Sequence, residues 1–155
     1  MMWKISIILI YSGAKITENL RREVGRGTVM AGKILIVEDN SRFAEILAIL
    51  LNEAGYKTSL AKNSGQGIGK ALTERPDLIL TDFNLPDMNA VETITILKKS
   101  PSISSIPIVI LTAETAPQLK TKALQAGAVE YLLKPIAPHD LVNVIRKLCP
   151  PDRFK

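Results

Sequence analysis

The sequence predicts an α/β protein with a single, doubly wound, five-stranded parallel sheet that carries helices on both faces. Three observations support this fold class. Short apolar segments alternate strictly with amphipathic ones five times along the chain, a pattern typical of parallel strands joined by right-handed crossover helices. Three of the apolar segments lack polar alternation, as expected for strands buried on both faces. The length of 155 residues suits one domain.

Each strand and helix can be placed in order along the chain. The first strand is expected at KILIVE, a β-branched apolar run, and the strands together at 33–38, 56–61, 77–81, 107–112 and 129–133. The segment 56–61 has the weakest alternation. Helices are expected at 41–55, 64–74, 89–99, 115–126 and 138–148. The first of them has a complete helical pattern, because apolar residues recur at helical spacing at Phe43, Ile46, Leu47, Leu50 and Leu51.

The charge distribution divides the chain. Residues 1–29 contain five basic and two acidic residues, a net charge of +3, so the remaining residues carry only +2 of the total +5. We interpret 1–29 as a poorly ordered or loosely attached N-terminal extension, 30–150 as the domain and 151–155 as a short tail. Either translation starts upstream of a usual start at Met30, or the extension has a function of its own.

Several classes of protein are disfavoured by the same composition. A domain that grips DNA usually has a concentrated basic face, so we expect no direct nucleic-acid binding. No apolar run approaches the roughly 18 residues of a membrane span, and the short apolar stretch at 5–11 lacks a cleavage site. With Cys149 as its single cysteine, the chain can form no internal disulfide. We therefore expect a cytoplasmic protein.

Polar side chains stand at the ends of four predicted strands. Glu38 and Asp39 end the first, Asp82 follows the third, Thr112 ends the fourth and Lys134 follows the fifth. The carboxyl ends of parallel strands share one edge of the sheet, where ligands bind in folds of this class. Two carboxylates about 4 Å apart repel by roughly 4 kcal/mol near a protein surface, so three of them either keep protons or bind a cation. Mg²⁺ (or Mn²⁺) suits such oxygen ligands.

This set of side chains is suited to phosphoryl transfer. A carboxylate can attack phosphorus and form an aspartyl phosphate, and the protein then contributes mainly positioning and charge neutralisation. Asp82 is the best nucleophile, since it follows the central strand and the other groups surround it. The Lys134 ammonium and the Thr112 hydroxyl can contact phosphoryl oxygens.

Four segments resemble the receiver domain of two-component response regulators over about residues 32–148: ILIVEDN (34–40), LILTDFNLPDM (78–88), PIVILTAE (107–114) and AGAVEYLLKPI (126–136). The resemblance implies a stand-alone, chemotaxis-regulator-like module with the flavodoxin-like strand order 2-1-3-4-5. It implies that a sensor histidine kinase or phosphotransfer protein phosphorylates Asp82. It implies a Mg²⁺ site made by Glu38, Asp39, Asp82 and the backbone carbonyl of Asn84, and a cis peptide bond between Lys134 and Pro135.

The resemblance also implies a switch. Thr112 would move toward the phosphoryl group and Tyr131 would turn inward behind it. A downstream effector protein would then bind the face formed by helix 115–126, strand 129–133 and helix 138–148. Only PPDRFK follows the last helix, so we expect a separate partner protein; a weak homodimer remains open. The protein would catalyse only its own phosphorylation and dephosphorylation, at a rate that the family sets partly through the positions of Asn84 and Glu114.

Two features depart from this family or invite another reading. Ala90 stands where the family commonly has glycine, and because alanine does not tolerate positive φ we expect the loop before helix 89–99 to take a different path. The run SGQGIGKA (64–71) lacks the first glycine and the final Ser or Thr of a phosphate-binding P-loop. Its three glycines are interpreted as loosening the start of that helix.

Two other functions remain as alternatives. Phosphatases of the haloacid dehalogenase type also combine Asp, Thr or Ser, Lys and Mg²⁺. Their Asp-x-Asp motif follows the first strand, however, and in this chain the first strand ends in Glu-Asp-Asn. A flavodoxin-like cofactor site would need a Ser/Thr/Gly loop at the same place, where Glu38 and Asp39 would instead repel a phosphate group.

Overall fold

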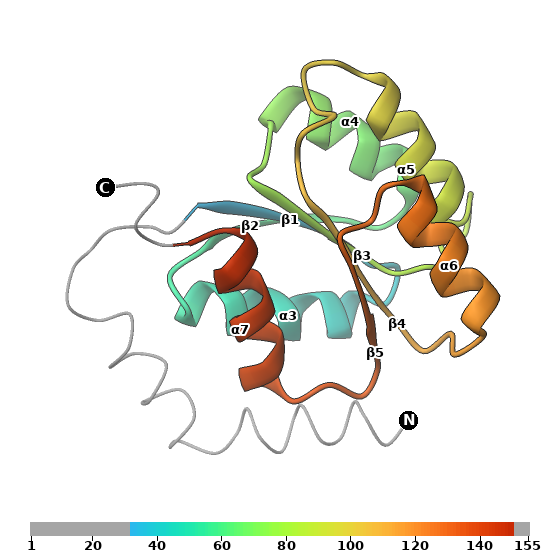
Figure 1. Cartoon of the computed structure of the whole chain (residues 1–155). Coiled ribbons are helices and arrows are strands. Elements are labelled where there is room, and N and C mark those ends of the chain that lie inside the picture. Colours follow the sequence, from blue (N-terminus) through green and yellow to red (C-terminus); the bar gives the residue numbers. More distant parts are fainter. Residues whose placement is uncertain (1–31, 151–155) are drawn as a thin grey trace.

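The computed structural model describes residues 32–150 and contains one parallel sheet in the order β2-β1-β3-β4-β5. The strands are β1 (Lys33–Val37), β2 (Lys57–Ala61), β3 (Leu78–Thr81), β4 (Ile108–Thr112) and β5 (Glu130–Leu133). A helix follows each strand in turn: α3 (Ser41–Glu53), α4 (Ser64–Glu74), α5 (Ala90–Lys99), α6 (Pro117–Ala126) and α7 (Pro138–Leu148). The predicted fold class and strand order are confirmed, and the labels follow Figure 1.

The predicted boundaries of the strands and helices agree with the structure to within two residues. The predicted extension at 1–29 and tail at 151–155 lie outside the described residues. Tyr56, expected to open the second strand, lies just before β2, and its buried hydroxyl donates a 2.8 Å hydrogen bond to the carbonyl of Cys149. Within residues 32–150, none of the helices has the length and apolar character that crossing a membrane requires.

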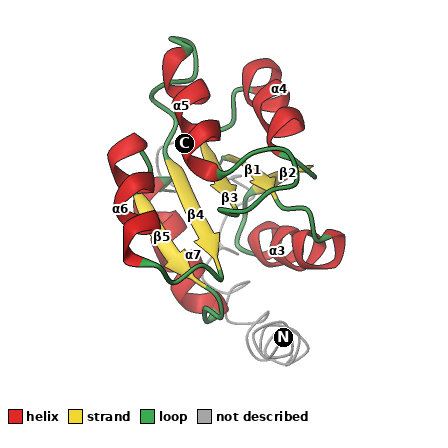
Figure 2. Cartoon of the chain, turned by 90° about the vertical axis from the view of Figure 1, so that its right-hand side faces the viewer, coloured by secondary structure: helices red, strands yellow, loops and turns green. Residues whose placement is uncertain are grey.

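Helices cover both faces of the sheet. Helices α3 and α7 lie on one face, and α4, α5 and α6 lie on the other (Figures 1 and 2). Side chains of β1 alternate between the two layers: Ile34 and Ile36 pack with α3 and α7, whereas Leu35 and Val37 pack on the opposite side. All four are at most 2% exposed, so the uninterrupted apolar run that predicted a doubly covered strand has that physical cause.

Asparagine side chains start three of the helices. The side chains of Asn40, Asn63 and Asn89 accept hydrogen bonds from the backbone amide of the third residue of α3, α4 and α5, respectively. Asn89 and Glu92 form a reciprocal capping box. These caps satisfy amides that have no partner within the helix, and they fix the path of the chain as it leaves the carboxyl edge of the sheet.

Ala90 fits the start of α5 without strain. Among the described residues the non-glycine position with positive φ is Arg75, so Ala90 adopts no conformation that would require glycine. Its amide donates a 2.8 Å hydrogen bond to the carbonyl of Phe83, which closes the loop after β3. The expectation that alanine would redirect this loop rested on a need for positive φ, and that need does not exist here.

The glycines of α4 have different roles. A Cβ atom added at Gly67 would lie 2.9 Å from Cγ2 of Val37, so this glycine allows α4 to approach β1 closely. A Cβ atom at Gly69 would meet nothing within 4 Å. Gly67 therefore has a packing role that the sequence analysis did not assign, and the looseness expected at the start of this helix stays a prediction.

These two glycines give a matched test of the packing. We expect Gly67→Ala to destabilise the fold by about 1–3 kcal/mol, because Val37 is buried and its branched side chain has little freedom to move. Gly69→Ala should stabilise it by about 0.5–1 kcal/mol through lower backbone entropy of the unfolded chain. Urea denaturation measures both changes, and equal effects of the two substitutions would contradict the packing role of Gly67.

Candidate functional site

Three carboxylates meet at the carboxyl edge of the sheet. Strands β1 and β3 are neighbours in parallel register, with Val37 opposite Thr81, so the residues that follow them lie side by side. One carboxylate oxygen each from Glu38, Asp39 and Asp82 lies within 4.8 Å of the other two. Glu38 is buried, Asp82 is half-buried and Asp39 is exposed. The structure therefore brings together the three acidic residues that the sequence analysis selected.

Lys134 reaches this cluster from β5, two strands away from β3. Its ammonium lies 3.2 Å from Oδ2 of Asp82 and 3.5 Å from Oε1 of Glu38, and its side chain is only 4% exposed. The Lys134 amide donates to the carbonyl of Thr112, and the Lys134–Pro135 peptide bond is cis, as the resemblance implies. One ammonium among three carboxylates leaves an excess of negative charge when all of them are ionised.

This excess charge and burial act on Glu38 most strongly. Desolvation is the largest effect and raises the pKa of the Glu38 carboxyl to about 7, while the Lys134 ammonium lowers it and the Asp82 and Asp39 carboxylates raise it further. The same excess of negative charge that favours a proton on Glu38 would also favour a bound cation. A set of three carboxylates, one of them with an exposed edge, matches the hard oxygen ligands that Mg²⁺ prefers.

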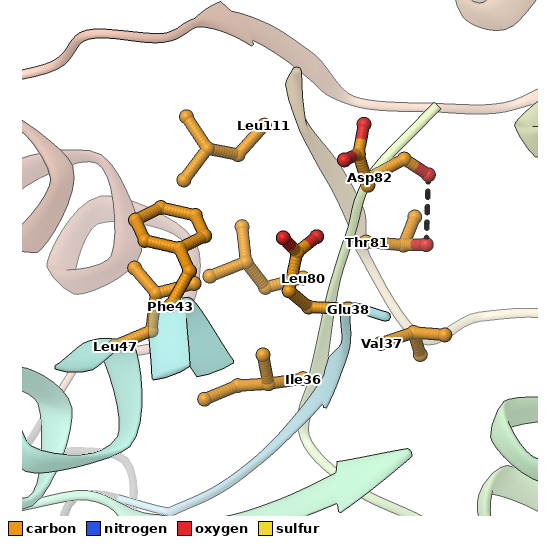
Figure 3. Close-up of a pocket in the computed structure, with 9 residues that line it drawn as sticks. All are labelled: Ile36, Val37, Glu38, Phe43, Leu47, Leu80, Thr81, Asp82 and Leu111. Carbon is orange, nitrogen blue, oxygen red and sulfur yellow. Dashed lines mark hydrogen bonds between the residues drawn. The ribbon is translucent and has the colours of Figure 1, made fainter. Parts of the chain in front are cut away.

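Asp82 has its two carboxylate oxygens in different surroundings. Oδ1 accepts a 2.6 Å hydrogen bond from the Phe83 amide, and Oδ2 faces the Lys134 ammonium. Figure 3 shows Asp82 and Glu38 on one side of a small pocket whose other side is apolar, with Phe43 and Leu47 from α3 and Leu111 from β4. The pocket that these residues line has a volume of about 10 Å³, room for about one water molecule. The carboxylates therefore pack closely against the apolar side chains.

Phe43 contacts the site in a way that its helical spacing did not reveal. The Lys134 ammonium lies 4.5 Å from the centroid of the Phe43 ring, a cation–π contact. Such contacts contribute about 2 kcal/mol when both partners are desolvated. The sequence pattern correctly predicted that Phe43 is buried, and it carried no signal that the ring face would lie beside the lysine.

Glu114 connects the remaining predicted residues. Its amide donates a 3.3 Å hydrogen bond to the Thr112 hydroxyl, and its carbonyl accepts a 3.0 Å hydrogen bond from the Tyr131 hydroxyl. Its carboxylate accepts a 2.6 Å hydrogen bond from the side-chain amide of Asn84. Asn84 thereby joins the loop after β3 to the loop after β4, and the role of its backbone carbonyl as a metal ligand stays a prediction.

Tyr131 already lies inward in this structure. The residue is 7% exposed, and its ring packs edge-on against Phe83, with the ring centroids 6.4 Å apart. Burial, with the charges of Glu114 and Asp82, raises the pKa of the Tyr131 hydroxyl. The tyrosine is thus linked by packing to the residue after Asp82 and by hydrogen bonding to the residue that contacts Thr112.

Asp87 anchors the loop that follows Asp82. Its carboxylate accepts hydrogen bonds of 2.9 and 2.8 Å from the amides of Ser64 and Gly65 at the start of α4. These donors, that of Gly65 first, lower the pKa of the Asp87 carboxyl. The cap comes from more than twenty residues away, so no local pattern could have identified it.

The raised pKa of Glu38 makes the stability of the metal-free protein depend on pH. The folded chain keeps this proton up to about pH 7, whereas the unfolded chain releases it near 4.5. The resulting stability is fully present below the unfolded pKa and is lost as the pH rises through about 7. Between pH 6 and pH 8 we expect a loss on the order of 1 kcal/mol, a few degrees in Tm.

Thermal melts in chelator measure this loss, and Glu38→Gln serves as the matched variant. The substitution removes the titrating group and should flatten the decline between pH 6 and pH 8. A variant whose melting temperature falls as steeply as that of the wild type would assign the pH dependence to another group.

The chain matches the family described as response regulator receiver domain over residues 34–146. It is 38% identical over 128 residues to the phosphate regulon transcriptional regulatory protein PhoB of Pseudomonas aeruginosa, covering 79% of this chain and 56% of that protein. It is 36% identical over 117 residues to the DNA-binding response regulator MtrA of Mycobacterium tuberculosis, covering 76% of this chain and 50% of the relative. The chain spans about half the length of the curated relatives it matches.

Solved structures match this chain over nearly the whole length of the solved protein. The chemotaxis protein CheY4 of Vibrio cholerae superposes with a TM-score of 0.71 at 29% identity, covering 75% of this chain and 97% of that one. The receiver domain of the sensor histidine kinase PA1611 of Pseudomonas aeruginosa gives a TM-score of 0.71 at 28% identity, with coverage of 76% and 97%. That structure has a magnesium ion coordinated in its active site cleft. By its fold, its acidic cluster and its match over residues 34–146, this chain belongs to the response regulator receiver domain family.

Proposed function

We propose that Asp82 accepts a phosphoryl group from a sensor histidine kinase or a phosphotransfer protein in a Mg²⁺-dependent reaction. The observation that carries the proposal is the meeting of Glu38, Asp39 and Asp82 within 4.8 Å, with the Lys134 ammonium 3.2 Å from Asp82. An acidic cluster of this kind is costly to assemble, and at the carboxyl edge of a parallel sheet it points to a functional site.

The residues of this chain would share the reaction as follows. A carboxylate oxygen of Asp82 forms the new P–O bond while the P–N bond to the donor histidine breaks. The electron pair of that bond stays on the imidazole nitrogen, which is protonated as it leaves. Lys134 neutralises charge on the phosphoryl oxygens, and the Phe83 amide fixes the orientation of Asp82 through its 2.6 Å hydrogen bond.

Glu38, Asp39, Asp82 and the Asn84 carbonyl would hold Mg²⁺ (or Mn²⁺). The bound cation would neutralise the carboxylates and the phosphoryl oxygens, which otherwise repel each other. The proton that Glu38 holds in the metal-free protein would have to leave first, so metal binding and proton release are coupled.

Signalling would follow from the contacts of Glu114. A Thr112 hydroxyl that turned toward a phosphoryl oxygen would give up the Glu114 amide, and the same residue holds Tyr131 through its carbonyl. A charge change at Asp82 can thus bias the packing of Tyr131. The surface formed by α6, β5 and α7 exposes Leu124, Val129 and Leu133, which suits contact with a separate effector protein. The same apolar side chains would also suit a weak homodimer.

The remaining proposals follow from the same role. The protein acts as a phospho-acceptor and has no external substrate. We also propose that this domain lies in the cytoplasm, where a sensor histidine kinase or a phosphotransfer protein would carry the phosphoryl group. We propose that residues 32–150 make no direct contact with nucleic acid. The phosphatase and flavodoxin-like alternatives lose their support, since the chain belongs to the receiver family and its first strand is followed by Glu38 and Asp39.

Phosphorylation can be tested directly with acetyl phosphate and Mg²⁺. We expect the intact mass to increase by one phosphoryl group, through a bond that is stable in acid and labile in base, as for an acyl phosphate. Asp82→Asn should abolish the adduct and a chelator should prevent it. Asp87→Asn is the matched control and should retain the adduct, because Asp87 lies in the same loop but faces α4. Wild-type protein that stays unmodified would refute the proposal.

The switch can be tested through the hydroxyl of Thr112. At saturating acetyl phosphate we expect phosphorylation of the wild type to shift the ring signals of Tyr131 in NMR spectra. Thr112→Ala should be phosphorylated more slowly and should lose this response, since nothing then exchanges the Glu114 amide for a phosphoryl oxygen. Thr112→Ser keeps the hydroxyl and should restore the shift. An unchanged Tyr131 response in Thr112→Ala would exclude Thr112 from the switch.

A further inference from the structure

Phe43 belongs both to the hydrophobic core and to the candidate site. It is 1% exposed and belongs to the apolar layer of α3 and α7, yet the Lys134 ammonium lies 4.5 Å from the centroid of its ring. Figure 3 shows the ring on the apolar side of the pocket that Glu38 and Asp82 also line. Packing alone explains why an apolar side chain stands there, but any aliphatic residue of similar size would satisfy that need.

The Lys134 ammonium is held in part by carboxylates that the proposed reaction also uses for other purposes. Its carboxylate neighbours, Asp82 at 3.2 Å and Glu38 at 3.5 Å, are also the groups proposed to hold the cation and to take the phosphoryl group. Their attraction for the ammonium falls as their charge is neutralised. The attraction of an aromatic face comes from its quadrupole, which does not titrate and does not depend on a bound cation.

We propose that Phe43 is a positioning residue that holds the Lys134 ammonium at the phosphorylation site through its ring face while the carboxylates are engaged. This role rests on the proposed function of Asp82 and Lys134. Phe43 would act through the lysine, which makes it a positioning residue and not a catalytic one.

The ring is held firmly enough for this role. The Phe43 amide donates a 2.9 Å hydrogen bond to the side chain of Asn40, so the residue is fixed in the first turn of α3. Leu47 of the same helix and Leu111 of β4 line the small cavity beside the ring and restrict its movement. A ring fixed by a helix cap and by the core keeps the ammonium on one side of the site without using a charge.

Two measurements on two substitutions test the proposal. Phe43→Leu removes the aromatic face and keeps an apolar side chain, and Phe43→Tyr keeps an aromatic face. Leu50→Ala is the control for core packing, since Leu50 is buried in the same layer of α3 and does not line the site. The first measurement is the NMR shift of the Lys134 ε-methylene protons in metal-free, unphosphorylated protein. The second is the rate of phosphorylation by acetyl phosphate at saturating Mg²⁺.

We expect the wild-type ε-methylene signals to be displaced upfield by the ring, the displacement to vanish in Phe43→Leu and to persist in Phe43→Tyr. The phosphorylation rate should fall on the order of ten-fold in Phe43→Leu and recover in Phe43→Tyr, the size expected when one cation–π contact is lost. Leu50→Ala should lower the melting temperature and leave the rate within about two-fold of the wild type. If Phe43→Leu fails to fold, Phe43→Met replaces it with a side chain closer in volume.

The outcomes separate the proposal from the function on which it rests. A wild type that shows the upfield shift but takes up no phosphoryl group overturns the proposed function and leaves the contact standing. A wild type that is phosphorylated normally, with Phe43→Leu equally fast, overturns the positioning role. Rates that fall in proportion to stability in both Phe43→Leu and Leu50→Ala also overturn it, since they reduce Phe43 to a core residue.

Discussion

The mutual repulsion of three carboxylates at the carboxyl edge of the sheet is the constraint on which the rest of this structure depends. The parallel pairing of β1 with β3 places Glu38 and Asp39 beside Asp82, and the fold must tolerate the result. Lys134 compensates part of the charge, and the pKa of Glu38 rises to about 7 because burial and its neighbours oppose its ionisation. Bringing three carboxylates together costs the fold stability, which is why the cluster points to a functional site.

Rigid and adjustable parts are arranged around this cluster in different ways. The loop after β3 is tied down at both ends, by the hydrogen bond from the Ala90 amide to Phe83 and by the contacts of Asp87 with α4. The loop after β4 instead holds Glu114, whose amide, carbonyl and carboxylate each serve a different neighbour. A residue with three such contacts can exchange one of them while keeping the others, which is a suitable property for a switch.

The relatives tell us more about the chemistry of the site than about the protein that binds this chain. Membership in the receiver family accounts for the acidic cluster, and the receiver of PA1611 contains magnesium at its active site cleft. The curated relatives are about twice as long as the matched region, and the roles in their descriptions belong to whole proteins. Under the proposed function, an effector protein would bind the surface of α6, β5 and α7, where Leu124, Val129 and Leu133 are exposed.

The sequence by itself determined the fold class, the order of the ten strands and helices and the acidic, hydroxyl and lysine residues at the strand ends. These follow from local periodicity and from one rule, that parallel strands end at a common edge. Only the tertiary structure decided that the Phe43 ring faces Lys134, that Asp87 caps α4, that Glu114 joins Thr112 to Tyr131 and that Gly67 admits Val37. Apart from the local hydrogen bond between Glu114 and Thr112, each of these contacts joins separate segments of the chain. Such a contact depends on how closely the segments approach, and no periodic pattern within either segment encodes that distance.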